Sequence, residues 1–458
     1  MAFSPDLADR RFGTGLSPRV DPPSDPADIL SRLAAPDDMA RRFPIPLTDA
    51  AAPTVADLRA LQRARAESDA AEEAYRAGRQ RMEAVRLATF RAHLARGVET
   101  ADGFRERLTQ FWADHFTIRA RNGLMRHHVT PYVEETIRPH VAGRFADMLR
   151  AAVTHPMMLL YLDQVNSVGP NSPVARDGRG LNENLAREVL ELHTLGVGGP
   201  YGQGDVRQLA ELFTGLSWGI DQGFWFRPRY AEPGAETVLG ESYGPDASLD
   251  EIHRLLDDLA AHPATARHLA RKLAVHFVSD DPPPGLTDAM SAAYLASGGA
   301  LLPVYEAMLR HPAAWLRDVE AGPGAAKVMQ PLQFIQSALR GIGARGETLL
   351  SADRQTTMRH LMRPLLHMGQ DWERPDGPDG LPEAAEAWIT PQGMAARIDW
   401  AFRAPVALLD DLPDPRVAVH QLLGPHAPQT VVFAAGAAED RVEGIGVILT
   451  SAAFQRRN

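Results

Sequence analysis

The spacing of apolar residues along the chain is that of α-helices. Apolar side chains recur at intervals of three and four residues, which places them on one face of a helix, and most of these segments are bounded by Gly, Pro, Asp or Asn. Residues 55–96 are almost all strong helix formers, interrupted by Gly78, and predict one long helix or a helical hairpin. Further helices are predicted at 102–118, 124–138, 183–195, 205–214, 249–260, 263–278, 326–340, 353–368, 391–402 and 439–450.

One segment departs from this helical pattern. Within residues 218–244, aromatic residues alternate with Gly and Arg, which predicts a small β-hairpin or an ordered aromatic loop. Two stretches rich in Pro and Gly, 169–180 and 374–382, have the length of either linkers or loops that form a site. Because no internal repeat and no shift in composition marks a boundary, the sequence predicts a mainly α, multi-helical single globular unit over residues 1–458.

The composition restricts the chemistry. The chain of 458 residues has 58 acidic and 48 basic residues, and its formal net charge of −10 argues against a nucleic-acid-binding protein, because phosphate contacts need a clustered basic surface. Cys is absent, which excludes thiolate metal sites and a Cys nucleophile. Only Lys272 and Lys327 are lysines, so Schiff-base or P-loop lysine chemistry has few places to occur.

The sequence also bears on the cellular setting. Its longest apolar runs are far shorter than the ~20 residues that a bilayer span requires. The first residues carry Asp6 and Asp9 and lack the basic start and apolar core of a secretory signal. These features predict no membrane span and a cytoplasmic protein.

The most informative segment is LNENLAREVLELHTLG at 181–196. At 100° per residue, Asn184, Arg187, Glu188 and Glu191 fall on one narrow line of a helix. We call these four residues the polar stripe. Apolar residues flank the stripe on both sides, whereas a surface helix would have a broad polar face. The pattern therefore predicts a buried helix whose two carboxylates and guanidinium face an enclosed space.

The polar stripe allows three interpretations. In the first, Arg187 and Glu188 form a buried ion pair that holds the helices in register. In the second, Glu188 or Glu191 is a general acid or base whose pKa is raised by burial, and Arg187 orients an anionic or carbonyl group. In the third, Glu188 and Glu191 bind a metal ion together with a His from another helix, although the paired Glu-x-x-His motifs of such bundles are missing.

Two other helical segments supply candidate residues. In 104–116, Trp112 and His115 lie on or beside an apolar stripe, where a His is more often a core residue than a ligand or base. In 262–277, Arg271 belongs to a polar face and His276 borders apolar positions. This basic face is either solvated, or neutralises the polar stripe, or binds an anion.

Five segments carry a resemblance to a known family. They include RLTQFWADHF at 107–116 and NENLAREVLELHTLGVGGPY at 182–201, followed in order by 205–215, 262–284 and 448–457. In these motifs the chain resembles the bacterial family catalogued as domain of unknown function 1800. The resemblance implies a single, predominantly helical unit. It also implies that relatives are often exported and encoded beside a sulfatase-like or phosphatase-like partner, which makes the periplasm the alternative to the cytoplasm.

The leading hypothesis from the sequence is an enzyme of hydrolase or transferase type with an enclosed polar pocket. Glu188 is the expected acid or base, and the other expected catalytic residues are Arg187, Glu191 and His115. The expected substrate-binding residues are Asn182, Glu183, Asn184, Trp112, Arg271 and His276. No metal ligand is assigned, and the cofactor is left open.

Two further hypotheses come from other classes of protein. The first is a non-catalytic assembly or partner-binding protein, in which the polar stripe is a structural network and the aromatic residues at 224–226 form the contact surface. The second is a metal- or haem-dependent oxidoreductase. The composition favours neither of them over an enzyme with acid/base chemistry.

Overall fold

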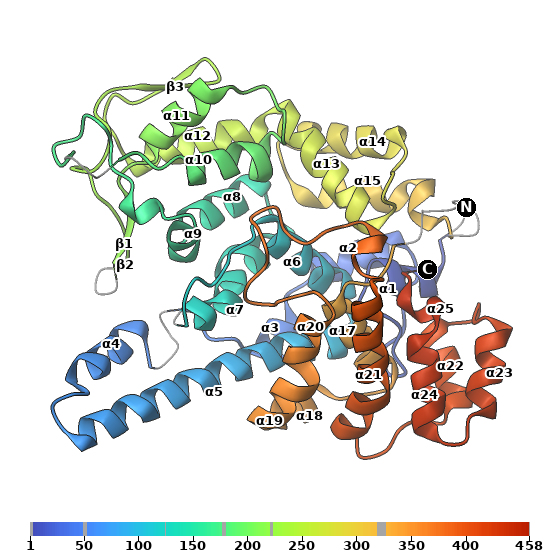
Figure 1. Cartoon of the computed structure of the whole chain (residues 1–458). Helices are drawn as coiled ribbons and strands as arrows, with labels where there is room; N and C mark the ends of the chain where they lie inside the picture. The colour runs from blue at the N-terminus through green and yellow to red at the C-terminus, as the bar shows by residue number, and fades with distance from the viewer. Residues whose placement is uncertain are drawn as a thin grey trace.

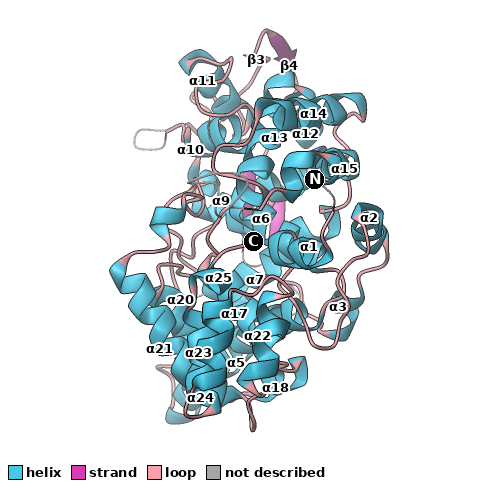
Figure 2. Cartoon of the chain, turned by 90° about the vertical axis from the view of Figure 1, so that its right-hand side faces the viewer, coloured by secondary structure: helices cyan, strands magenta, loops and turns pink. Residues whose placement is uncertain are grey.

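Helices dominate the computed structural model, which describes residues 3–48, 53–123, 125–175, 180–219, 223–317 and 327–457. In this part of the chain, strands form only two short antiparallel pairs (Figure 2). The mainly α class and the single globular unit predicted from the sequence are therefore confirmed. No helix in the described ranges combines the length and the apolar character needed to cross a membrane.

Two hydrophobic cores organise the fold, one in the upper and one in the lower part of Figure 1. The first core contains the N-terminal helices and the helices of the middle of the chain. Their bounds are α1 (Pro5–Arg11), α2 (Pro26–Ala34), α6 (Gly103–His115), α7 (Val129–Tyr132), α8 (Phe145–Thr154), α9 (Pro156–Tyr161), α10 (Asn184–Glu188), α11 (Gln203–Leu212), α12 (Leu249–Ala261), α13 (Pro263–Phe277), α14 (Pro284–Ala296) and α15 (Leu301–Arg310). Phe104, Phe277 and Tyr305 pack edge to face at its centre.

The second core contains the C-terminal third of the chain and one end of a long helix, α5 (Asp69–Glu99). Phe334 packs edge to face against Trp400 and Phe454 in its interior. The other helices of this part are α17 (Pro331–Gly341), α18 (Gly346–Ser351), α19 (Arg354–Thr356), α20 (Arg363–His367), α21 (Pro391–Leu408), α22 (Pro415–Leu423), α23 (Gln429–Ala437), α24 (Arg441–Thr450) and α25 (Ala452–Gln455). A short helix, α3 (Asp38–Arg42), packs on α5.

A helical hairpin projects from the second core. It consists of α4 (Val55–Ala64) and α5, and it is the second of the two arrangements that the sequence allows for residues 55–96. The first half of α5 has charged residues on several faces and extends away from the rest of the fold (Figure 1). Its second half carries Phe90, Leu94 and Val98 on one face and is buried in the core.

The non-helical segment consists of two β-hairpins. β1 (Leu216–Gly219) pairs with β2 (Gly223–Phe226), and β3 (Glu236–Val238) pairs with β4 (Glu241–Tyr243). This confirms the β-hairpin predicted near 218–244, and residues 220–222 lie outside the described part of the chain.

The predicted helix 183–195 is not regular. It begins as α10 and continues as a π-helix, η5 (Val189–Thr194), in which Leu195 N donates to Leu190 O. A π-helix has more residues per turn than an α-helix. Positions after Glu188 therefore rotate away from the line that a constant 100° per residue predicts.

A loop at residues 370–383 joins the two cores. It follows α20 and appears in orange at the centre of Figure 1, where it passes in front of α6. Backbone hydrogen bonds anchor it to the first core, since Ala120 N donates to Glu373 O at 3.0 Å. The loop overlaps the Pro- and Gly-rich stretch 374–382, and it covers the boundary between the cores.

Candidate functional site

The polar stripe lies at the surface of the first core. Asn184 is exposed, and Arg187, Glu188 and Glu191 are only half-buried, with 40% of the Arg187 side chain exposed to solvent. The predicted burial of this helix and the enclosed space in front of its polar line are therefore wrong. Apolar residues flank this line because the helix packs against the core on both sides of it. Only the narrow line of polar residues is left exposed to solvent.

The predicted Arg187–Glu188 ion pair is also wrong. Arg187 instead donates to Glu183 at 3.2 Å and to Glu191 at 3.3 Å, one helical turn to either side. Gln203 donates to the same Glu183 oxygen that Arg187 contacts. These half-exposed contacts between neighbouring turns are typical of a solvated helix surface, and such pairs contribute only about 0.3–0.5 kcal/mol each.

Asn182 has a structural position at the start of this helix. Its side-chain oxygen accepts a hydrogen bond from Asn184 N at 2.9 Å, while its amide nitrogen donates to the carbonyls of Leu162 and Asp163. With these hydrogen bonds, Asn182 joins the start of α10 to the end of α9.

The other predicted site residues are distributed over separate places. Trp112 is fully buried and donates its indole N–H to the Tyr305 hydroxyl at 2.7 Å. Arg271 is exposed and lines a different cleft, beside the Pro-rich segment 282–284. The structure therefore does not bring Trp112 and Arg271 together with the polar stripe. Of the predicted residues, only His276 faces the cavity described below.

His115 belongs to a group of three buried or mostly buried histidines. Its ring lies 6.0 Å from that of His193 and 6.2 Å from that of His268. His115 Nε2 donates to the His193 carbonyl, and His268 Nε2 donates to the Leu192 carbonyl. Burial lowers the pKa of His193 to about 3 and that of His268 to about 4, so these rings are neutral at pH 7. The group anchors η5 to α6 and α13.

A polar cavity lies at the boundary between the two cores. Its volume is about 80 Å³, and its walls come from α5, α6, α7, α13, α17 and the loop 370–383. We call it the junction cavity. Its polar wall residues are His93, Thr109, Gln110, Asp114, Thr117, Tyr132, His276, Gln330, Gln370 and Asp371. Ligand sites often form at such boundaries between packed units.

Asp114 is one of two carboxylates on the wall of the junction cavity, and Asp371 is the other. Asp114 comes from the last turn of α6, and both of its oxygens accept from Leu381 N, at 2.9 and 3.1 Å. Burial raises the pKa of Asp114 to about 7, against the opposing effects of Lys272 and of the Leu381 hydrogen bond. Gly380 makes this approach possible: its φ is +84°, and a Cβ there would lie 2.7 Å from Asp114 Oδ2.

His276 connects the cavity to a network of charges. Its Nδ1 lies 2.6 Å from Glu383 Oε1, and its Nε2 lies 3.3 Å from the Arg107 guanidinium. Arg107 can only donate, so Nε2 accepts and Nδ1 carries the proton. Burial lowers the pKa of His276 to about 3, which agrees with a neutral ring.

Glu383 is held by a buried lysine as well as by His276. Lys327 Nζ lies 3.0 Å from Glu383 Oε2 and 2.6 Å from Asp280 Oδ1, and only 3% of its side chain is exposed. Although burial opposes ionisation, the hydrogen bond from His276 and the charge of Lys327 lower the pKa of Glu383. The carboxylate is therefore ionised and fixed in place.

Lys272 lies near the same carboxylates. It comes from α13, and burial lowers its pKa, while Asp114, Glu383 and Asp379 act in the opposite direction. Both lysines of the chain therefore lie in this region. Asp114, Glu383 and Asp379 were missed by the sequence interpretation, but the rarity of Lys in a chain that otherwise uses Arg is a signal that could have found the region. A compact ammonium shifts its pKa on burial more readily than a guanidinium does.

The polar stripe is linked to this region through Asp379. Burial raises the pKa of Glu188 to about 7, and the charges of Glu191 and Asp379 add to that shift. Asp379 also raises the pKa of Asp114. The loop 370–383 thus brings two carboxylates of raised pKa, Glu188 outside and Asp114 inside, under the influence of one acidic side chain.

This arrangement suits proton transfer more than metal binding. A carboxyl group with a pKa near 7 exchanges protons readily at neutral pH. The ranges described by the structure contain no group of three or more His, Asp or Glu side chains placed to hold a metal ion. The hypothesis of a metal-dependent oxidoreductase therefore gains no ligand set from these residues.

The fold and the junction cavity define a class: a mainly helical protein with two cores and an interior polar site between them. The chain belongs to the family whose model is described as "Protein of unknown function (DUF1800)", which matches residues 10–456. This confirms the resemblance carried by the sequence motifs. Neither the curated proteins nor the solved structures include one with significant similarity to the chain.

Proposed function

We propose that the protein is an enzyme of hydrolase or transferase type whose acid/base chemistry takes place at the junction cavity. The observation that carries this proposal is a cavity between the two cores onto which a carboxyl group, Asp114, and a neutral imidazole, His276, both face. The polar stripe, on which the sequence placed this chemistry, is half-exposed to solvent and therefore excludes water less well.

Asp114 is the general base of this proposal. With a pKa of about 7, it is substantially ionised at neutral pH and remains basic enough to accept a proton from water or from a substrate hydroxyl. The junction cavity, with a volume of about 80 Å³, has room for a few water molecules beside this carboxylate. Lys272 lies outside the cavity wall, but its charge acts on Asp114 and favours the ionised form of this base.

The loop 370–383 holds the site together. It contributes Leu381 N to Asp114 and Glu383 to His276, so the positions of both cavity groups depend on the same segment. His93 adds an imidazole at the opposite wall, and among the residues described its Nε2 has no hydrogen-bond partner. A substrate polar group would pair with this atom, because buried polar atoms are rarely left without a partner.

The test is a screen with chromogenic esters, phosphoesters and glycosides, followed by variants of the protein. Asp114→Asn is expected to lower any activity found by 10²-fold or more, about the usual contribution of a positioned base. The rate of the wild type is expected to rise with pH through about 7, as Asp114 loses its proton. A triple variant of Arg187, Glu188 and Glu191 should retain most of the activity. If Asp114→Asn kept full activity and the triple variant lost it, the polar stripe would be the site.

The alternative function is binding to a partner protein, such as the sulfatase-like or phosphatase-like proteins suggested by the family resemblance. The observation that favours it is Trp225 at the end of the β1–β2 hairpin, which is 40% exposed and has the Arg227 guanidinium 4.6 Å from its ring centroid. Exposed aromatics with an adjacent Arg are enriched at interfaces. Co-purification of a partner that Trp225→Ala abolishes would favour this function, whereas a partner retained by the variant would count against it.

A further inference from the structure

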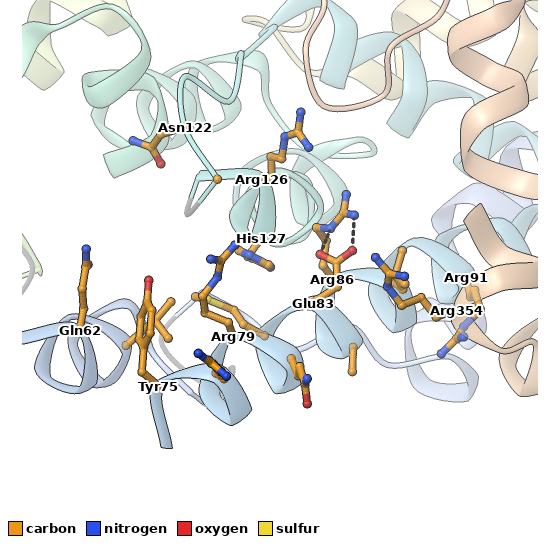
Figure 3. Close-up of a pocket in the computed structure, with 17 residues that line it drawn as sticks. Gln62, Tyr75, Arg79, Glu83, Arg86, Arg91, Asn122, Arg126, His127 and Arg354 are labelled. Atoms are coloured by element: carbon orange, nitrogen blue, oxygen red, sulfur yellow. Dashed lines mark hydrogen bonds and ion pairs between the residues drawn. The ribbon is translucent and has the colours of Figure 1, made fainter. Parts of the chain in front are cut away.

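A second cavity, larger and more open, lies between the helical hairpin and the body of the fold. Its volume is about 1130 Å³, and its walls come from α4, α5, the residues Asn122, Gly123, Arg126 and His127, and Arg354 at the start of α19 (Figure 3). We call it the basic groove. It shares no wall residue with the junction cavity, so it is a separate site.

Arginine dominates the wall of the basic groove. Six arginines face it and only one carboxylate, Glu83, does. The arginines are Arg76, Arg79, Arg86, Arg91, Arg126 and Arg354. The chain as a whole has a net charge of −10, so this concentration of positive charge is a local feature and not a property of the general surface. A concave surface of one sign focuses the electrostatic field on its ligand.

Part of this positive charge is compensated within the protein. Arg86 donates to Glu83 at 2.8 Å and to Glu373 at 2.5 Å, and Arg76 pairs with Glu72 at 2.9 Å. Arg86 is thereby fixed in the groove wall, and its pKa is raised by these carboxylates although burial opposes this. Even with Glu72 and Glu373 counted, arginines outnumber carboxylates at the groove.

The remaining cations face the groove without acidic partners at hydrogen-bond distance. Arg79 and Arg354 are exposed, and among the described residues neither side chain has a hydrogen bond or an ion pair, although the charge of Arg354 contributes to lowering the pKa of Glu83. Arg91 donates only to neutral oxygens, those of Ala352 and Thr357. The nearest carboxylate oxygen to Arg126 Nε belongs to Glu373, at 3.7 Å.

Three buried nitrogen atoms in the wall also lack hydrogen-bond partners among the described residues. They are Arg91 Nε, Arg126 Nε and His127 Nδ1. Burial lowers the pKa of His127 to about 4, and the charge of Arg86 acts in the same direction. His127 therefore adds a neutral imidazole to the cationic wall, from the side opposite α5 (Figure 3).

The chemistry of the wall indicates the class of ligand. Guanidinium groups reach the groove from α5, from Arg126 and from α19, that is, from three directions. A tetrahedral phosphoryl group offers acceptor oxygens in several directions, whereas a carboxylate offers two in one plane, and Arg binds phosphate through paired N–H donors. Tyr75 and the apolar residues Leu58 and Met82 lie at the same groove and provide a surface for a less polar part of the ligand.

We propose that the basic groove binds a small phosphorylated molecule with at least two negative charges. The volume of the groove is close to the upper end of the range for small-molecule sites, about 300–1,000 Å³. The acidic charge of the rest of the chain disfavours a long polyanion, which would extend beyond the groove. The Arg86–Glu373 ion pair places this ligand next to the loop that covers the junction cavity.

The experiment is isothermal titration of the whole protein with inorganic pyrophosphate. The double variant Arg79→Gln, Arg354→Gln removes two exposed cations without ion-pair partners, so the fold should be unaffected. It is expected to bind pyrophosphate at least tenfold more weakly than the wild type. Arg81→Gln is the matched control, because Arg81 is an exposed arginine of the same helix that does not line the groove. The control should bind within twofold of the wild type.

The outcomes separate the proposal from its competitors. Absence of pyrophosphate binding to the wild type, or equal binding by the double variant, would overturn the site. Citrate of similar charge binding as tightly as pyrophosphate would overturn the phosphoryl assignment. A short single-stranded oligonucleotide that bound more tightly than pyrophosphate through the same arginines would overturn the small-molecule assignment. Weaker binding at higher salt by the wild type, with a smaller salt effect in the double variant, would support it.

Discussion

The polar stripe and the surroundings of the junction cavity both contain carboxylates paired with basic side chains, but the pairs are made in different ways. In the stripe, Arg187 pairs with residues four positions away on its own helix, and the pairs are open to water. At the junction cavity, the partners come from distant parts of the chain: Leu381 donates to Asp114, and Glu383 pairs with Lys327 and His276. The comparison shows that sequence spacing produces pairs along one helix that remain half-exposed, whereas pairs between distant segments arise only from the fold.

This contrast leads to an order of expected effects. Charges that are paired across distant segments in a buried place depend on each other, because removing one leaves the other without compensation. Charges paired along one exposed helix do not, since water replaces the lost partner. Variants of the junction cavity should therefore change stability much more than variants of the polar stripe.

Glu383→Gln is expected to have the largest effect. The change keeps the shape of the side chain and removes the charge that compensates buried Lys327 and accepts from His276. Breaking a buried pair in this way costs about 3–5 kcal/mol of unfolding free energy, which urea denaturation at pH 7 would measure. Because Asp280 remains beside Lys327 and still compensates part of its charge, the expected loss of unfolding free energy is at the lower end of this range.

Glu386→Gln is the control for that variant. Glu386 is an exposed carboxylate three residues further along the chain, so the same chemical change is made without loss of a buried partner. Its unfolding free energy should stay within about 0.5 kcal/mol of the wild type. Equal losses in the two variants would show that the Glu383 network does not stabilise the fold.

Asp114→Asn is expected to stabilise the protein at neutral and alkaline pH. The pKa of Asp114 is about 7 in the folded state and 3.8 in an exposed one, so the folded protein binds a proton that the unfolded chain releases. The contribution of Asp114 to the stability of the wild type therefore falls as pH rises from about 4 to about 7. An Asn at this position cannot be ionised, and the variant should gain roughly 2–4 kcal/mol relative to the wild type by pH 8.

The pH dependence is the discriminating measurement for Asp114. The advantage of the variant should be smallest near pH 4, increase up to about pH 7 and stay constant above it. Asp376→Asn, an exposed Asp of the loop 370–383, should show no such dependence. A stability difference between Asp114→Asn and wild type that did not vary with pH would mean that Asp114 titrates normally.

The fold could be predicted from the sequence where local spacing decides it. The segment predicted as a helix at 263–278 is α13, Pro263–Phe277, because its apolar residues repeat with the helical period and Pro occupies its first turn. The π-helix η5 could not be predicted, because i+5 hydrogen bonds leave no mark in the apolar pattern. The constant rotation of 100° per residue, on which the predicted polar stripe depends, therefore does not apply after Glu188.

The candidate site was only partly predictable. His276 was recognised, but its partner Glu383 follows it by 107 residues, in a loop without periodicity. Asp114 stands beside His115 in a quoted motif, yet its pKa is raised by burial under segments that the fold brings together from elsewhere, such as the loop with Gly380 and Leu381. The rarity of lysine, in contrast, is a property of the composition, so it can be recognised without any knowledge of packing.

Glu188→Gln is expected to have the smallest effect and gives the sharpest test of the contrast. Burial and the charges of Glu191 and Asp379 raise the pKa of Glu188 from 4.5 to about 7, so its contribution lowers stability as pH rises from about 4.5 to about 7 and stays constant above that. The residue is half-buried, and solvent screening reduces the effect of the substitution to less than about 1 kcal/mol, with the variant equal to or more stable than the wild type at pH 8. Arg187→Gln removes the pairs to Glu183 and Glu191. It should lower the free energy of unfolding by less than about 1 kcal/mol, both at pH 7 and at pH 8. A loss of about 3 kcal/mol or more in Glu188→Gln by thermal denaturation would be the result of breaking a buried pair. It would place the polar stripe in the same class as the junction cavity and remove the distinction between them.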